Sequence, residues 1–250
     1  MTMLSAFFHA AFYNPIYNAL VALISFVPGG DIGIAVILLT IVIRLILLPF
    51  SLSAARTQRA IKLLDPKLKA LKEEHKGDKE KEAVATLALY KEEKVNPFAS
   101  ILTVFVQLPV LLALFWVFRY EPFQTLDAAR LYAFTPIPQT VSVLFLGFIS
   151  VTGKSMVLAV LAGITQLLQA QIALSGTMKP SGTGMQADFA RVMALQLKFV
   201  FPFLIAIIAY TTSSAIALYF ITTNLAGVLQ ELYVRRKLVP VTQEVIEKKD

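Results

Sequence analysis

The sequence contains no cysteine and only two histidines, His9 and His75. Without cysteine there is no disulfide, thiol nucleophile, iron–sulfur cluster or acylated cysteine anchor. The apolar runs that we assign to the membrane hold no histidine, and no aspartate or glutamate apart from Glu231 near the end of the last run. Intramembrane proteases and proton-coupled carriers are built around such groups. The sequence therefore predicts no enzyme activity, no metal site and no cofactor.

What the chain has in abundance is apolar sequence. Hydrophobic residues make up 57% of it, and the mean hydropathy is +0.69. Polar residues fall in blocks between apolar runs, and about 20 apolar residues suffice to cross the hydrocarbon layer as a helix. We therefore predict an all-α polytopic membrane protein with five transmembrane helices, at residues 33–52, 97–119, 155–174, 191–210 and 214–234.

Basic residues are distributed very unevenly along the chain. Residues 1–43 have no lysine or arginine, whereas the stretch from Arg56 to Lys94 carries eleven. Cytoplasmic segments of membrane proteins are enriched in these residues. We therefore predict that the N-terminus lies outside, and that residues 53–96 and the C-terminus lie in the cytoplasm.

The segments between the predicted spans differ in character. Residues 1–32 predict an extracytoplasmic helix lying in the membrane interface, with a signal peptide as the alternative. Residues 120–154 are extracytoplasmic, and their apolar part, 141–151, is too short to span the bilayer. Residues 175–190 predict a flexible cytoplasmic loop, and residues 235–250 a basic cytoplasmic tail.

The 53–96 segment predicts a cytoplasmic hairpin of two amphipathic helices. A turn at residues 75–78 separates them, and acidic residues begin the second helix as the helix dipole favours. The expected apolar faces are Ile61, Leu64, Leu68 and Leu71 on the first helix, and Val84, Leu87 and Tyr90 on the second.

One charge lies inside the first predicted span. Arg44 is set in the run GIAVILLTIVIRLILLP at residues 33–49. A guanidinium at mid-depth is costly unless it faces water or polar groups, so it is a functional-site hypothesis. The alternative is that Arg44 extends to the headgroups past Pro49. About 12 Å of helix separates Arg44 from Leu52, which favours the functional interpretation.

Further polar residues lie within the other spans. Single residues of this kind often only hydrogen-bond to a neighbouring helix. Their occurrence together with one arginine favours a shared polar lining. In chain order they are Ser100, Thr103 and Gln107, then Gln166 and Gln169, then Tyr219, Thr223 and Asn224.

Three stretches together resemble one known family. They are TIVIRLILLP at 40–49, KVNPFASILTVFVQLPVLLALFWVF at 94–118 and ALYFITTNLAGVLQ at 217–230, with the basic hairpin between the first two. The arginine, the asparagine–proline pair and the Q-x-P motif at this spacing resemble the YidC/Oxa1/Alb3 membrane protein insertases. The resemblance extends from about residue 7 to residue 237.

This resemblance implies five helices around a hydrophilic groove that opens to the cytoplasm and to lipid. It implies that Arg44 is the groove arginine, that Thr40 shares its face and that Gln107 lies in the groove. Tyr219 and Phe220 would be the aromatic pair where substrate helices pass. The short connection from Ser213 to Ala215 departs from the proline and glycine that are common there.

The same resemblance implies a function and a set of partners. The chain would insert nascent hydrophobic segments into a bacterial plasma membrane and assist their folding, alone or with the Sec translocon. The partners would be nascent membrane proteins, the lipid bilayer and possible contacts with the ribosome, but no DNA. The alternatives are an ion or solute channel in which Arg44 selects anions, or a chaperone without insertion activity. The basic tail could bind ribosomal RNA or anionic lipid equally well.

Overall fold

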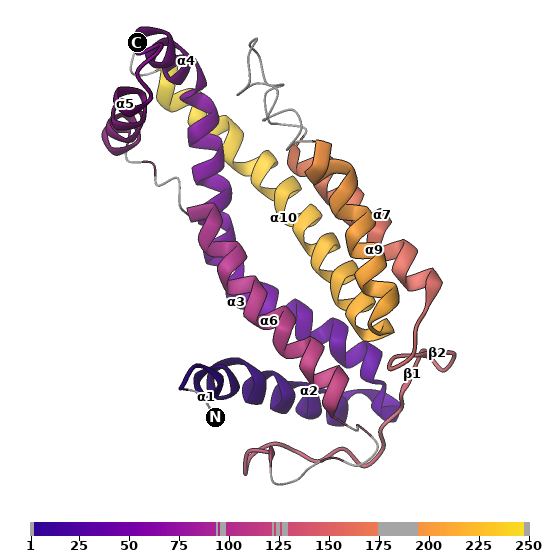
Figure 1. Ribbon diagram of the computed structural model, residues 1–250. Coiled ribbons are helices and arrows are strands. Elements are labelled where there is room, and N and C mark those ends of the chain that lie inside the picture. The colour runs from indigo at the N-terminus through magenta and orange to yellow at the C-terminus, as the bar shows by residue number, and fades with distance from the viewer. Residues whose placement is uncertain are drawn as a thin grey trace. The chain divides into compact units, whose positions relative to one another are not determined.

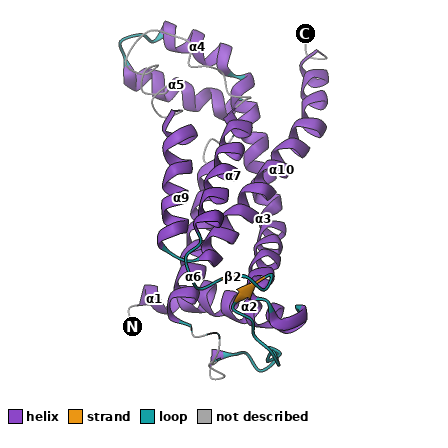
Figure 2. Ribbon diagram, turned by 90° about the vertical axis from the view of Figure 1, so that its right-hand side faces the viewer, coloured by secondary structure: helices purple, strands orange, loops and turns teal. Residues whose placement is uncertain are grey.

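The computed structural model describes all residues except 1–2, 94, 96–98, 122, 124–125, 127–129, 175–194 and 248–250. The described chain is mostly helical, with one small antiparallel sheet (Figures 1 and 2). The helices are α1 (Met3–Phe8), a π-helical turn (His9–Tyr13), α2 (Asn14–Phe26), a 3-10 turn (Pro28–Gly30), α3 (Ile32–Leu63), α4 (Asp65–Glu74), α5 (Lys79–Glu92), α6 (Ala99–Tyr120), α7 (Met156–Leu174), a second π-helical turn (Gln196–Val200), α9 (Phe201–Thr211) and α10 (Ser214–Glu247).

Several of these helices suit a membrane. Four are long and apolar enough to cross one, at Ser5–Phe26, Ile32–Thr57, Met156–Ala173 and Ser214–Val234, and two shorter apolar helices lie at Gln107–Tyr120 and Lys198–Thr211. The predicted fold class, an all-α polytopic membrane protein, is thereby confirmed. The start of the predicted fourth span, residues 191–194, lies outside the described residues.

The chain forms two compact units. The core unit contains residues Met1–Ile46 and Val106–Leu229, and the hairpin unit contains residues Leu47–Phe105 and Gln230–Asp250. The main buried cluster lies in the core unit and draws side chains from α2, α3, α6, α7, α9 and α10. α7 and α9 approach closely where Gly163 meets Ala206, since an added Cβ at Gly163 would lie 3.0 Å from the Ala206 Cβ. Small residues permit such close helix contacts.

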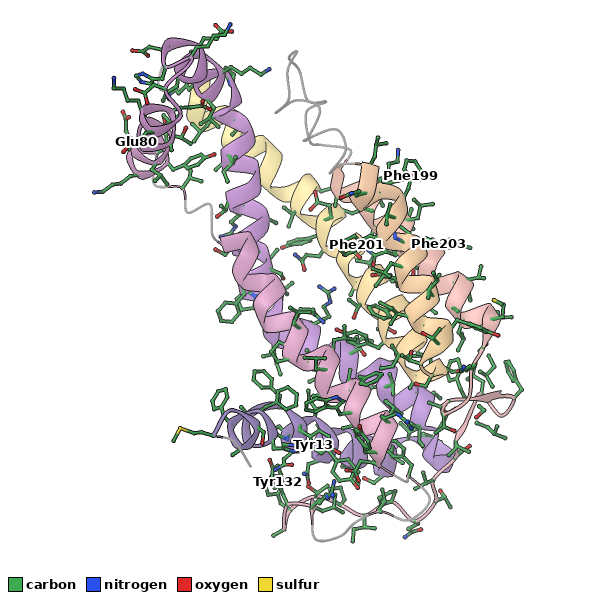
Figure 3. All side chains as sticks on the ribbon, viewed as in Figure 1. Tyr13, Glu80, Tyr132, Phe199, Phe201 and Phe203 are labelled. Carbon is green, nitrogen blue, oxygen red and sulfur yellow. The ribbon has the colours of Figure 1, made fainter. Side chains whose placement is uncertain are left out.

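The N-terminal helices lie across the ends of α3 and α6 in the core unit (Figure 1). Tyr17, Leu20 and Ile24 of α2 are fully buried there. Asn18 is buried too, and its side-chain oxygen accepts from the Tyr132 N–H (2.7 Å) and the Thr135 hydroxyl (2.8 Å). Asn18 therefore joins α2 to Arg130, Tyr132 and Thr135, and Figure 3 shows Tyr132 at the same end of the unit as Tyr13.

A short β-hairpin follows, where the sequence predicts a segment too short to span. β1 (Leu144–Phe145) pairs with β2 (Ile149–Ser150). Backbone bonds join Ser142 to Gly30 (2.9 Å) and to Ile32 (3.1 Å). Asp31 accepts from the backbone N–H of Ile34 at the start of α3 and from that of Leu146 in the β-turn. These bonds fix the start of α3 against the hairpin.

Two helices run further than the sequence predicts. α3 continues through Pro49 to Leu63, so the predicted boundary between a span ending at residue 52 and a hairpin beginning at 53 does not interrupt the helix. α10 continues to Glu247, so described residues of the predicted basic tail prolong the last helix. Polar sequence outside a bilayer can continue a helix, and hydropathy marks only where the apolar part stops.

The hairpin unit contains the predicted helix pair, α4 and α5. Leu64, Leu68 and Leu89 form its buried cluster, with Leu71 and Tyr90 packed against it. The expected apolar face of the second helix is partly wrong, because Val84 and Leu87 are exposed. A salt bridge joins Lys67 of α4 to Glu93 at 2.6 Å, and the Glu93 carboxylate raises the pKa of Lys67.

The predicted acidic start of the second hairpin helix is confirmed. Asp78 is the N-cap of α5, and its carboxylate accepts from the Lys81 backbone N–H at 3.1 Å. This bond and the Lys81 ammonium lower the pKa of Asp78. Glu80 and Glu82 follow in the first turn and Lys91 lies in the last. Each complements the helix dipole.

Candidate functional site

Arg44 lies on the part of α3 that belongs to the core unit, and its guanidinium reaches α10. The Nη2 atom donates to the Thr223 carbonyl oxygen at 2.9 Å, whereas Nε is buried without a hydrogen-bond partner. Within the described parts of the chain, no carboxylate lies at ion-pairing distance from Arg44. Within the described residues, the arginine is therefore a half-buried cation whose guanidinium is met by a carbonyl dipole and by no carboxylate.

A second contact reaches the same helix from α6. The Gln107 amide donates to the Tyr219 hydroxyl, one helical turn from Thr223. Tyr219 and Phe220 are both buried, and their rings meet edge to face with centroids 5.5 Å apart. Arg44 and Gln107, which lie on different helices, thus both contact the Tyr219–Thr223 turn of α10.

Thr40 is one turn before Arg44 but makes its hydrogen bond within its own helix. Its hydroxyl donates to the Val36 carbonyl oxygen at 2.7 Å, and the side chain is buried. Hydroxyl groups in membrane helices commonly bond in this way to the carbonyl four residues earlier. Thr40 belongs to the same face as Arg44 without a hydrogen bond to it.

Asn224, the remaining predicted site residue on this face of the last span, contacts α7 rather than α3. Asn224 is buried and donates to the Thr165 hydroxyl at 3.2 Å and to the Ala162 carbonyl oxygen at 3.4 Å. Gln169 of α7 packs closely against Gly227 of α10. An added Cβ at Gly227 would lie 2.4 Å from the Gln169 Nε2 atom. These contacts have the character of interhelical hydrogen bonding and close packing.

The predicted site residues thus divide into two sets. Arg44, Gln107, Tyr219 and Thr223 come together across α3, α6 and α10. Asn224 and Gln169 join α7 to α10. Gln166 is half-buried on α7, and the side chain of Thr103 lies outside the described residues.

Sequence reasoning missed the polar groups that hold the N-terminal end of the core unit. Glu121 is buried, accepts from the Tyr13 hydroxyl and pairs with Arg130. Asn18 and Asp31 are likewise buried and hydrogen-bonded. The sequence did offer one signal, because each of these carboxylates and amides lies directly beside an apolar run. If such a side chain is buried, it needs a hydrogen-bond partner.

A guanidinium in an apolar helix, with no carboxylate partner in the part of the chain that the structure describes, attracts anionic groups more strongly than one in water. Its Nη2 donates to the Thr223 carbonyl oxygen of α10, and the Gln107–Tyr219 bond joins α6 to the same turn of α10. Such a site can bind and orient an anionic group.

The comparisons with known proteins decide the family. The model of the 60Kd inner membrane protein family matches residues 23–241. The chain belongs to this family. The match covers both units, including α3 with Arg44 and the part of α10 that contacts it. Together with the apolar helices, membership of the 60Kd inner membrane protein family indicates a multi-pass protein of the inner membrane.

Individual members of the family carry a functional name. The membrane protein insertase YidC of Fusobacterium nucleatum is 31% identical over 228 residues, which are 89% of this chain and 98% of that protein. The protein of the same name from Clostridium tetani is 29% identical over 84% of each chain. That of Ectopseudomonas mendocina is 30% identical over 84% of this chain, which spans 32% of that relative.

Proposed function

We propose that this chain is a membrane protein insertase that moves hydrophobic segments of nascent membrane proteins into the lipid bilayer and assists their folding. The observation that carries the proposal is Arg44, a cation in an apolar helix with no carboxylate partner among the described residues. The family and the names of its members agree with this function.

The physical problem of insertion explains why such an arginine is useful. A hydrophilic tail crosses a bilayer slowly because its polar groups lack partners in hydrocarbon. A hydrated groove that reaches Arg44 would shorten the apolar path. The guanidinium would attract acidic residues of the tail, while the apolar segment moves sideways into lipid, driven by its own burial. No nucleotide is required for these steps.

The groove that we propose is lined by Arg44, Gln107, Tyr219 and Thr223, with the Gln166 and Gln169 amides on α7 at its margin. It opens to the cytoplasm and to lipid and is closed at the other side. Support comes from the convergence of Arg44 and Gln107 on one turn of α10. Thr40, Phe220 and Asn224, which are buried, would support its wall.

We further propose that the N-terminus is outside and the C-terminus inside, with α4 and α5 in the cytoplasm. The charge distribution supports this orientation, since eleven basic residues lie between Arg56 and Lys94. In that orientation the hairpin unit would receive the emerging chain, and the basic end of the chain would meet ribosomal RNA or anionic lipid. Cooperation with a Sec-type channel is part of the same proposal.

Site-specific photo-crosslinking tests the function and the groove together. A photoreactive amino acid at Gln107 should crosslink to a ribosome-stalled membrane protein with an acidic tail. The same amino acid at Val160, an exposed position on α7, is the matched control. Equal yields from the two positions would contradict a groove at Gln107. Ion flux through the purified protein without a nascent chain would instead favour a channel.

A further inference from the structure

The core unit contains a cavity whose lining does not include Arg44. It has a volume of about 420 Å³ and lies where α6 ends, α9 ends and α10 begins, which can be followed in Figure 1. Its lining includes Phe115, Phe118, Arg119, Thr152, Ser213 and Ile216. Cavities of roughly 300–1,000 Å³ with a few placed polar groups are typical of small-molecule sites.

Two polar groups of the lining are available to a ligand, the Arg119 guanidinium and the Ser213 hydroxyl, whereas the Thr211 and Thr212 hydroxyls already donate to carbonyl oxygens of α9. Arg119 has no carboxylate at ion-pairing distance within the described ranges. The nearby Glu121 is occupied by Arg130 and Tyr13. Ser213 is only 6% exposed, yet its buried hydroxyl has no hydrogen-bond partner in the described structure. A buried hydroxyl without a partner is costly, so a ligand with acceptor atoms would satisfy it.

The first backbone N–H groups of α10 are not available to that ligand, because they already have partners. Ser214 donates its N–H to the Gly153 carbonyl oxygen at 2.7 Å, and Ala215 donates to that of Val151 at 3.0 Å. The side chains of Arg119 and Ser213 therefore supply the recognition. A guanidinium and a hydroxyl together suit the oxygens of a phosphate group.

The other part of the lining is apolar and points to an amphipathic ligand. Phe115, Phe118 and Ile216 face the same space as Arg119. Trp116 and Tyr120 are the sequence neighbours on that last part of α6, and these residue types concentrate at the headgroup level of a bilayer. Arg119 lies over the Tyr120 ring, 5.9 Å from its centroid.

We propose that this cavity binds an anionic phospholipid. Arg119 and Ser213 hold the phosphate oxygens, and the apolar side chains contact the glycerol and the first acyl carbons. Lipid binding at this cavity does not depend on insertase activity, so it can be measured separately from insertion. The turn at Thr212 and Ser213 connects α9 to α10. The bound lipid would also connect the end of α6 to these two helices.

Native mass spectrometry of the purified full-length chain in detergent tests the proposal. Phosphatidylglycerol is titrated beside a diacylglycerol with the same acyl chains and beside glycerol phosphate, which has the headgroup phosphate without the chains. We expect phosphatidylglycerol to bind at least about tenfold more tightly than either, since it alone satisfies both parts of the lining. Equal binding of diacylglycerol would overturn the phosphate contact, and equal binding of glycerol phosphate would overturn the assignment to lipid.

Variants locate the site. Arg119→Gln should weaken phosphatidylglycerol binding about tenfold and Ser213→Ala about threefold, as charged and neutral hydrogen bonds differ. Arg119→Lys should restore part of the affinity. Lys198→Gln is the matched control, because it also removes one positive charge. Lys198 lies just before the start of α9, whereas the cavity lies at the end of α9. Unchanged binding in Arg119→Gln, or an equal loss in Lys198→Gln, would overturn the proposal. Thermal unfolding in detergent confirms that each variant is folded.

Discussion

At the residue scale, Arg44 could be predicted from the sequence and its partner could not. A charge in a long apolar run stands out because hydrocarbon excludes it. Its contact is a backbone carbonyl 179 residues further along the chain, which no side-chain pattern reveals. The Gln107–Tyr219 bond likewise joins positions 112 residues apart. The sequence therefore indicated which polar residues lie within the apolar helices, but not which of them pair, and their role as a site remains a prediction.

Charge reversal at Arg44 distinguishes electrostatic attraction from simple hydration of the groove. Arg44→Glu should reduce insertion of clients with acidic tails much more than that of clients with neutral tails, because like charges repel. Arg44→Lys should retain most activity, as a point charge is sufficient for attraction. Insertion of paired clients that differ only in the tail is the measurement. An equal loss for both tails would count against attraction.

At the element scale, the apolar helices could be predicted well and their ends poorly. The third predicted span, 155–174, agrees closely with α7 at Met156–Leu174, because apolar sequence and helix stop together there. α3 and α10 instead continue beyond the apolar sequence. On α5 the helical spacing of Val84 and Leu87 suggested a buried face, but Leu89 is buried instead. The face that a helix buries depends on where its partner lies, which periodicity alone does not contain.

Glycine substitutions test the connection between α3 and the β-hairpin. Gly29 and Gly30 both have positive φ, of 72° and 65°. An added Cβ at Gly29 meets nothing within 4 Å, whereas at Gly30 it would lie 2.0 Å from the Thr140 carbonyl oxygen. Gly29→Ala should therefore cost about 1–2 kcal/mol for the left-handed conformation alone. Gly30→Ala should cost about 1–3 kcal/mol more, because the backbone itself must move.

The free energy of unfolding in detergent measures this difference, and Gly29→Ala serves as the control for the conformational cost. The two variants should separate by several degrees in melting temperature. Equal destabilisation would show that residues 140–142 do not hold the start of α3 in the way that the Ser142–Gly30 bond indicates.

At the scale of the whole molecule, composition and charge predicted the class of protein before any element was known. Apolar content indicated a multi-pass protein, and the family match agrees with it. The uneven distribution of basic residues predicts an N-terminus outside and a C-terminus inside, and this orientation is still to be measured. The pairing of Tyr13 with Glu121 and of Asn18 with Thr135 could not be predicted, because it depends on how the N-terminal helices pack against distant parts of the chain.

The absence of cysteine makes the orientation directly measurable. Single cysteines at Glu80 in α5 and at Phe134, which is 82% exposed, can be introduced into an otherwise cysteine-free chain. A membrane-impermeant thiol reagent added to intact cells should label Phe134→Cys and should label Glu80→Cys only after lysis. The opposite pattern would reverse the proposed orientation.

The most direct test of the insertase proposal is insertion by the purified protein alone. The chain is reconstituted in liposomes, and a small single-span client with an acidic N-terminal tail is presented to it. Protease protection of the client then reports insertion. We predict protection with the wild-type chain and its loss with Arg44→Ala, a change that leaves the helix apolar and folded. Protection no greater than in empty liposomes, or an unchanged level with folded Arg44→Ala, would contradict an autonomous insertase that works through Arg44.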